Sequence, residues 1–143
     1  MERIKIKLPE KFNYSTELKV RVTDLNYGNH LGNDSVLSLV HEARIQFFNH
    51  LGYKNEIDIE GCGIILADAA LVFKSEAYLN DILITEIGIG DLSRFGFDLI
   101  YRISNKSTGI NVAHVKTGIV FFDYVNKKVV SIPSAFLEKI MTF

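Results

Sequence analysis

The alternation of polar and apolar positions predicts a strand followed by a loop near the start of the chain. Residues 17–23 alternate with a period of two, as the residues of a half-buried strand do. Residues 24–33 break this alternation with two glycines and three asparagines, residue types that accept unusual backbone angles. We therefore expect residues 24–33 to form a long, ordered loop.

A long helix is expected to follow the loop. Asn33, Asp34 or Ser35 can cap its start, and Gly52 can end it. The apolar positions recur at helical spacing and form an unusually wide stripe, which predicts a largely enclosed helix. These positions are Val36, Leu37, Leu39, Val40, Ala43, Ile45, Phe47, Phe48 and Leu51.

The rest of the chain predicts mainly strands. From about residue 62 to residue 132, apolar runs and period-2 segments are separated by turn-forming residues, as in four or five antiparallel strands. Pro133 is expected to open a short closing helix that reaches about Met141. The expected strands cover residues 64–74, 82–89, 97–103 and 112–123.

This order of elements predicts an α+β fold. One enclosed helix beside a run of antiparallel strands favours a sheet wrapped around one long central helix. Such a sheet has edges, and exposed edges invite pairing with another copy, so we expect a homodimer. The length of the chain, 143 residues, and its 48% hydrophobic content indicate one domain over residues 1–143.

Charge and cysteine content narrow the function. The 16 basic and 17 acidic side chains give a net charge of −1, which argues against a nucleic-acid binder with a general basic surface. The single cysteine, Cys62, excludes an internal disulfide and a cysteine-based zinc site. Residues 1–7 lack a signal-peptide pattern, and no apolar run approaches the roughly 18 residues of a membrane span. We expect a cytoplasmic protein with no bound metal.

Two adjoining motifs resemble a known family. The loop reads Asp24-Leu-Asn-Tyr-Gly-Asn-His-Leu-Gly-Asn33, and the helix contains Glu42-Ala-Arg and ends in Leu51-Gly52. They are similar to the Asp-x-Asp-x-x-Gly-His-Val-Asn-Asn loop and the Glu-x-Ala-Arg helix of the 4-hydroxybenzoyl-CoA thioesterase-like branch of the hotdog superfamily. The later strands fit the same family, so the resemblance covers nearly the whole chain.

This resemblance implies a fold, a reaction and partners. It implies a single hotdog domain that hydrolyses an acyl-CoA or acyl-carrier-protein thioester, with water attack assisted by a carboxylate. CoA or the carrier protein would enter as part of the substrate, with no separate cofactor. The acyl group would lie along the central helix between two subunits, in a homodimer or a dimer of dimers.

One departure from the family pattern bears on the reaction. Asn26 stands where the branch commonly has its catalytic aspartate, and an amide cannot take a proton from water at neutral pH. Three other carboxylates are candidates for that role. Asp24 could instead brace the loop, and Glu42, on the helix, could instead form a salt bridge. Glu76 is similar in place to a strand glutamate of plant acyl-carrier-protein thioesterases.

Other groups could share the work of the predicted site. His30 could orient water or donate a hydrogen bond to the thioester carbonyl, or it could be a structural loop residue. Asn26 could position water through its amide. Backbone N–H groups from Tyr27 to Asn33 and at the helix N-terminus could hold the oxyanion. Basic side chains that could contact the carrier's phosphates are Lys74, Arg102, Lys106 and Lys116.

Two other functions stay open at this point. Asn26 favours a non-catalytic protein that binds or assembles with acyl thioesters through the same pocket. Another hotdog reaction, such as hydroxyacyl dehydration, ranks third, because the Phe-Pro that usually follows the histidine of those dehydratases is absent.

Overall fold

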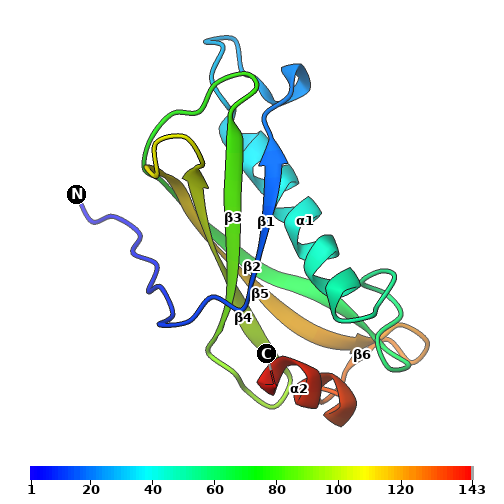
Figure 1. The fold of residues 1–143 in the computed structure, drawn as a ribbon. Helices are drawn as coiled ribbons and strands as arrows, with labels where there is room; N and C mark the ends of the chain where they lie inside the picture. Colours follow the sequence, from blue (N-terminus) through cyan, green and yellow to red (C-terminus); the bar gives the residue numbers. More distant parts are fainter. Residues whose placement is uncertain (143) are drawn as a thin grey trace.

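An antiparallel sheet curves around one long helix in the computed structural model, which describes residues 1–142 (Figure 1). A short 3-10 helix, η1 (Val22–Asp24), precedes the long helix α1 (Asn33–His50), and α2 (Ser134–Met141) follows the last strand. The strands in the described residues are β1 (Tyr14–Lys19), β2 (Gly63–Phe73), β3 (Ile82–Gly90), β4 (Gly96–Asn105), β5 (Asn111–Asp123) and β6 (Lys128–Val129).

The strand order places β1 and β2 at the two edges of the sheet. The order is β1-β3-β4-β5-β2, every pairing is antiparallel, and β6 forms a short hairpin with β5. A bulge interrupts the pairing of β2 with β5 between Leu66 and Asp68. The predicted α+β fold, with the sheet wrapped around one helix, is confirmed.

The core fills the space between α1 and the concave face of the sheet. Val40, Ala43, Phe47 and Phe48 of α1 are fully buried, which removes their apolar surface from water. Alternate residues of β4 and β5 face them, as the period-2 pattern predicts. The buried apolar residues of these two strands include Phe97, Leu99, Tyr101, Ile103, Ala113, Val115, Ile119 and Phe121.

The first strand differs from its prediction. The strand covers Tyr14–Lys19 instead of residues 17–23, because the chain leaves the sheet after Lys19. Asp24 ends the extended region by accepting a hydrogen bond of 2.8 Å from the Arg21 amide, which closes η1. The prediction missed the start of the strand because Tyr14 and Thr16 count as polar positions in the alternation, although both residue types favour strands.

The long helix ends where the sequence predicts but is less enclosed than predicted. Gly52 follows it with a φ of +98°, a backbone conformation that glycine adopts easily. One face of α1 is open: Leu37 is 40% exposed, and Ser38, His41 and Glu42 are exposed. The prediction of a largely enclosed helix is therefore wrong for the single chain.

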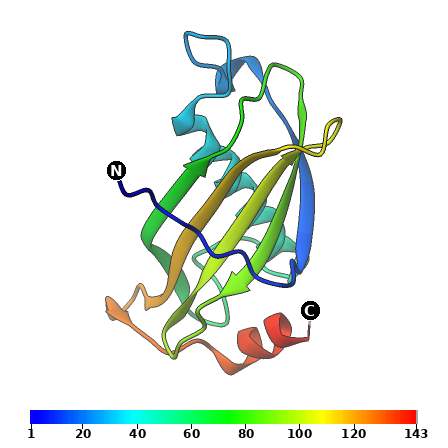
Figure 2. The same ribbon diagram turned by 90° about the vertical axis from the view of Figure 1, so that its left-hand side faces the viewer.

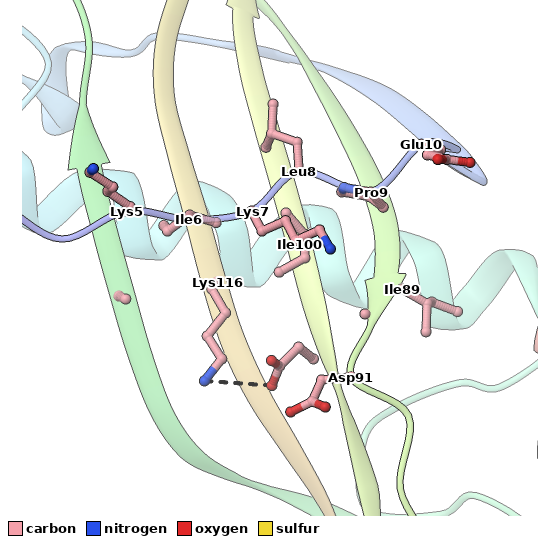
Figure 3. A pocket seen from close by; sticks show the side chains of 13 residues that line it. Lys5, Ile6, Lys7, Leu8, Pro9, Glu10, Ile89, Asp91, Ile100 and Lys116 are labelled. Carbon is pink, nitrogen blue, oxygen red and sulfur yellow. Dashed lines mark ion pairs between the residues drawn. The ribbon is translucent and has the colours of Figure 1, made fainter.

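The N-terminal segment crosses the convex face of the sheet, opposite α1 (Figure 2). Near the end of this segment the Arg102 guanidinium lies 4.3 Å from the centre of the Phe12 ring, and the Asn13 amide donates to the Ile87 carbonyl at 2.8 Å. A cavity of about 640 Å³ lies beneath residues 5–10 of the segment. Its lining includes Ile6, Leu8, Ile100 and Lys116 (Figure 3).

Candidate functional site

Two loops meet beside the N-terminus of α1. One is the loop of residues 25–32, and the other is the connection between β2 and β3, residues 74–81. The Leu31 amide donates to the Ala77 carbonyl at 2.8 Å, and His30 and Tyr78 form an isolated antiparallel bridge. Val20 adds two backbone hydrogen bonds to the turn at Asn80 and Asp81, of 3.0 and 2.9 Å. These bonds fix the two loops relative to each other.

The contact between the loops brings His30 and Glu76 together. His30 Nδ1 lies 3.3 Å from Glu76 Oε1, although the two residues are far apart in sequence. The His30 side chain is 36% exposed, so the imidazole is accessible to a ligand. When Nδ1–H of a neutral imidazole donates to a carboxylate, Nε2 carries the free lone pair and can accept a proton.

Tyr78 completes this cluster, and sequence reasoning missed it. Its hydroxyl donates to Glu76 Oε2 at 2.9 Å, and its ring meets the His30 ring edge-on at 5.2 Å between centroids. The hydrogen bond to Glu76 is the main cause that raises the pKa of Tyr78 above its ordinary value of 10.0. The sequence signal that could have predicted the contact of Tyr78 with Glu76 is the Glu-x-Tyr spacing, because alternate residues of an extended segment share one side.

Asn26 braces the loop on which His30 lies. Its Oδ1 accepts hydrogen bonds from the Gly28 amide at 2.8 Å and from the His30 amide at 3.3 Å. Its Nδ2 group makes no hydrogen bond within residues 1–142. The residue therefore holds the backbone through its oxygen and keeps two amide protons for a ligand.

Asp24 has a structural role in this arrangement. It is 3% exposed, and its carboxylate accepts from the Arg21 amide and forms an ion pair of 3.2 Å with the Arg21 guanidinium. Its carbonyl accepts from the Gly32 amide at 2.9 Å. A Cβ on Gly32 would lie 2.6 Å from Oδ1 of the exposed Asp34 side chain, which would have to move aside to make room. Of the alternatives for Asp24, the structure favours bracing the loop.

Glu42 lies on the exposed face of α1. It accepts a hydrogen bond of 2.9 Å from Gln46 Nε2, one helical turn further on. Within residues 1–142 it forms no ion pair, and the structure does not bring it into contact with His30 or Glu76. The three predicted carboxylates are thus separated: Glu76 pairs with His30, Asp24 braces η1, and Glu42 faces outward.

Most backbone N–H groups of the loop are already used. The amides of Gly28, Asn29 and His30 donate to Asn26, and that of Asp34 donates to the Asn33 side chain. Asn33, the first residue of α1, keeps the unpaired N–H typical of a helix start. Within residues 1–142 the predicted oxyanion donors that remain are therefore the Tyr27 amide, the N-terminus of α1 and the side chain of Asn26.

The predicted phosphate contacts are unequally available. Arg102 donates two hydrogen bonds to Glu86, of 2.8 and 2.9 Å, and Lys106 forms an ion pair of 2.7 Å with Glu17. Lys116 pairs with Asp68 at 2.8 Å. Lys74 is exposed, forms no ion pair within the described residues, and lies two residues before Glu76. Of the four, Lys74 is the one left free close to the pair of His30 and Glu76.

Other groups in residues 1–142 do not form a second reactive centre. The Cys62 thiol donates to the Ile59 carbonyl at 3.3 Å, and burial raises its pKa, which disfavours the thiolate. No three His, Cys, Asp or Glu side chains in this part of the chain gather as metal ligands would. None of its helices combines the length and apolar character needed to cross a membrane.

Several known proteins are similar to this chain in sequence or in fold. A curated protein of Aquifex aeolicus named "Putative esterase" is 28% identical over 98 residues, which cover 68% of this chain and 73% of that protein. A 1,4-dihydroxy-2-naphthoyl-CoA thioesterase from Synechocystis superposes with a TM-score of 0.81 at 21% identity, covering 90% of this chain and 95% of the other. A DHNA-CoA thioesterase from Staphylococcus aureus gives 0.79 at 16% identity, covering 90% and 88%.

These similarities confirm the hotdog fold, as the structure of a sheet around one central helix indicates. The family model of the thioesterase-like superfamily matches residues 20–140, which include both loops of the site. The chain belongs to this superfamily.

Proposed function

We propose that this protein hydrolyses an acyl thioester, with His30 and Glu76 as its catalytic pair. The observation that carries the proposal is the contact of 3.3 Å between His30 Nδ1 and Glu76 Oε1 beside the N-terminus of α1. Membership of the thioesterase-like superfamily supports the reaction class. The carboxylate orients the imidazole and favours the tautomer whose Nε2 can act as a base.

The proposed reaction has two steps. His30 Nε2 takes a proton from water, and the water oxygen forms a bond to the carbonyl carbon of the thioester. The carbonyl oxygen gains negative charge, which the helix N-terminus and the amide protons of Asn26 stabilise. The carbon–sulfur bond then breaks, and the imidazolium returns its proton to the leaving thiolate. The products are a carboxylic acid and a free thiol.

An apolar row on the edge strand β2 provides the proposed acyl site. Leu66, Leu71 and Phe73 lie opposite Ile119, Val115 and Ala113 of β5, all of which face the core. Directly opposite residues share one face of a sheet, so the row faces the side of α1. Leu66 is 47% exposed and Phe73 56% exposed. The row therefore offers apolar surface for an acyl group close to Glu76.

The proposed substrate is an acyl-CoA, bound at the contact of two subunits. Lys74, at the end of the apolar row, offers a free ammonium group for a phosphate of the carrier. Two similar solved structures are described as thioesterases of aromatic CoA esters, which supports CoA before an acyl carrier protein. A second copy that covers β2 would enclose the acyl group, which supports a homodimer or a dimer of dimers.

The catalytic pair is tested by removing each member. His30→Gln and Glu76→Gln keep side chains of similar size and are each expected to lower kcat on the order of 10²–10⁴-fold. Release of free thiol from acyl-CoA substrates measures the effect. Glu42→Gln, a change of the same chemical kind on the open face of α1, is the matched control and should keep activity near the wild-type value. A large loss in Glu42→Gln alone would move the catalytic carboxylate to α1.

Asn26 supports a second candidate function, the binding of acyl thioesters without hydrolysis. An amide stands at the place of the family's usual catalytic carboxylate, and its oxygen is already engaged by two backbone amides. Isothermal titration with a non-hydrolysable acyl-CoA thioether, alongside the thiol-release assay, separates the two functions. Tight binding without thiol release from any matching thioester would favour the binding protein.

A further inference from the structure

We propose that Tyr78 is a positioning residue of the hydrolytic site, which holds Glu76 and through it sets the tautomer of His30. The inference rests on the proposed function and deepens it, because it assigns a role to a side chain outside the family motif. The juxtaposition that carries it is a chain of three groups: the Tyr78 hydroxyl, the Glu76 carboxylate and the His30 imidazole.

Both oxygens of the Glu76 carboxylate are engaged by different partners. Oε1 lies 3.3 Å from His30 Nδ1, and Oε2 accepts from the Tyr78 hydroxyl at 2.9 Å. The Glu76 side chain is 58% exposed. A glutamate with this much exposure has considerable rotamer freedom unless a partner restricts it. The Tyr78 hydroxyl supplies that restriction and keeps Oε1 directed at the imidazole.

Tyr78 can position Glu76 because Tyr78 is itself held firmly. Its amide donates to Asp81 Oδ2 at 2.8 Å, and its carbonyl accepts from the Asp81 amide at 3.0 Å. It is paired with His30 through a backbone bridge, and its ring packs at 89° to the His30 ring. The same residue thus contacts both members of the catalytic pair.

The hydroxyl group can be removed without removing the ring. Tyr78→Phe keeps the edge-on contact with His30 and deletes only the donor to Glu76 Oε2. Tyr124→Phe is a matched control, because the Tyr124 hydroxyl also donates one hydrogen bond, to the Ile64 carbonyl at 2.7 Å. Ile64 lies at the end of β2 away from Glu76, so this control loses one hydroxyl far from the site.

The first readout is the tautomer of His30 in the free protein, measured from its two ring ¹⁵N chemical shifts by NMR. A His30→Gln variant assigns the signals. In wild type the neutral ring should carry its proton on Nδ1, and Tyr78→Phe should shift the population toward the Nε2–H form. Glu76→Gln should shift it in the same direction, and Tyr124→Phe should leave it unchanged. An unchanged tautomer in Tyr78→Phe overturns the proposal.

The second readout is steady-state kinetics of thioester hydrolysis. Tyr78→Phe should lower kcat about tenfold with little change in KM, because the hydroxyl orients a catalytic group and does not touch the substrate. Equal kcat in Tyr78→Phe and wild type overturns the positioning role. If wild type hydrolyses no thioester, the proposed function fails, and the NMR measurement alone still decides whether Tyr78 sets the His30 tautomer.

Discussion

Asn26 shows that an amide can brace the loop of His30 although it cannot act as a base. An aspartate at this place would accept the same two backbone hydrogen bonds through one oxygen, so the loop that carries His30 does not depend on the amide. The chemical task needs a group that can accept a proton, and the structure places Glu76 in contact with His30, whose loop Asn26 braces. The departure from the family pattern is therefore compatible with hydrolysis by a different carboxylate.

The Asn26→Asp variant tests this division of tasks. We expect the variant to fold as wild type does, since the oxygen that braces the loop is preserved. Its kcat should fall on the order of 10²–10³-fold, because a carboxylate has no amide protons for the proposed oxyanion contact. Thiol release and thermal unfolding measure the two parts of the prediction. A gain of a hundredfold or more, on the order of a full general-base contribution, would show that the native site is catalytically impaired.

The buried imidazole of His114 should make the free energy of unfolding depend on pH. Its Nε2 is buried without a hydrogen-bond partner in the described chain, and its pKa is lowered from its ordinary value of 6.5 by burial first and then by the charges of Lys74 and Arg102. The unfolded chain therefore binds a proton at the His114 imidazole more readily than the folded chain does. The stabilising contribution of neutral His114 to the free energy of unfolding is complete above pH 6.5 and is lost as the pH falls below 6.5.

Replacing His114 should flatten this dependence. In His114→Gln, the free energy of unfolding from urea titrations should fall less between about pH 7.5 and about pH 5.5 than it does in wild type. The same slope in both proteins would mean that His114 does not resist protonation in the fold.

At the scale of elements, α1 is fixed to the sheet by a buried polar contact as well as by its apolar side. Arg44 is 3% exposed and forms an ion pair with Glu56, which lies in the loop after the helix. The Tyr101 hydroxyl, also interacting with Arg44, shares a hydrogen bond of 2.9 Å with Thr117. This contact joins α1, β4, β5 and the loop before β2.

Removing Arg44 should therefore destabilise the fold strongly. Arg44→Ala is expected to cost about 3 to 5 kcal/mol, because it leaves buried polar partners without their cation. Glu42→Ala, on the exposed face of the same helix, should change stability by less than about 0.5 kcal/mol. Equilibrium urea unfolding measures both variants. Similar losses of unfolding free energy in Arg44→Ala and Glu42→Ala would contradict the anchoring role of Arg44.

Elements were predicted better than the contacts between them. Regular spacing of Phe97, Leu99 and Tyr101 was enough to predict both β4 and the face it buries. The width of the apolar stripe on α1 was misleading, because Leu37 is apolar yet exposed in the single chain. The pair of His30 and Glu76 could not be predicted as a contact, since it depends on a backbone hydrogen bond between two distant loops.

At the scale of the whole molecule, the single chain leaves an apolar edge open. The helix α1 approaches β1 and β3 most closely (Figure 1), and the α1 side of β2, at the other edge of the sheet, carries exposed Leu66 and Phe73. An edge strand with an apolar face is a surface for association. The open face of α1 lies on the same side of the sheet.

We therefore predict that wild type is at least a dimer and that Phe73→Asp weakens it. Sedimentation equilibrium should give twice the chain mass of 16.2 kDa, or four times that mass for a dimer of dimers. Phe73→Asp should move the population toward monomer. Val125→Asp, at a residue 89% exposed in the turn between β5 and β6, is the control and should keep the wild-type mass. A monomeric wild type would contradict association through β2.

Hydrolysis by this protein is tested most directly by thiol release from a panel of acyl-CoAs of varied chain length and aromatic character. If His30 and Glu76 hydrolyse the thioester, wild type releases thiol from at least one class of acyl-CoA, and folded Glu76→Gln does so on the order of 10²–10⁴-fold more slowly. A flat response across the panel, or full activity in folded Glu76→Gln, would contradict hydrolysis by the pair of His30 and Glu76.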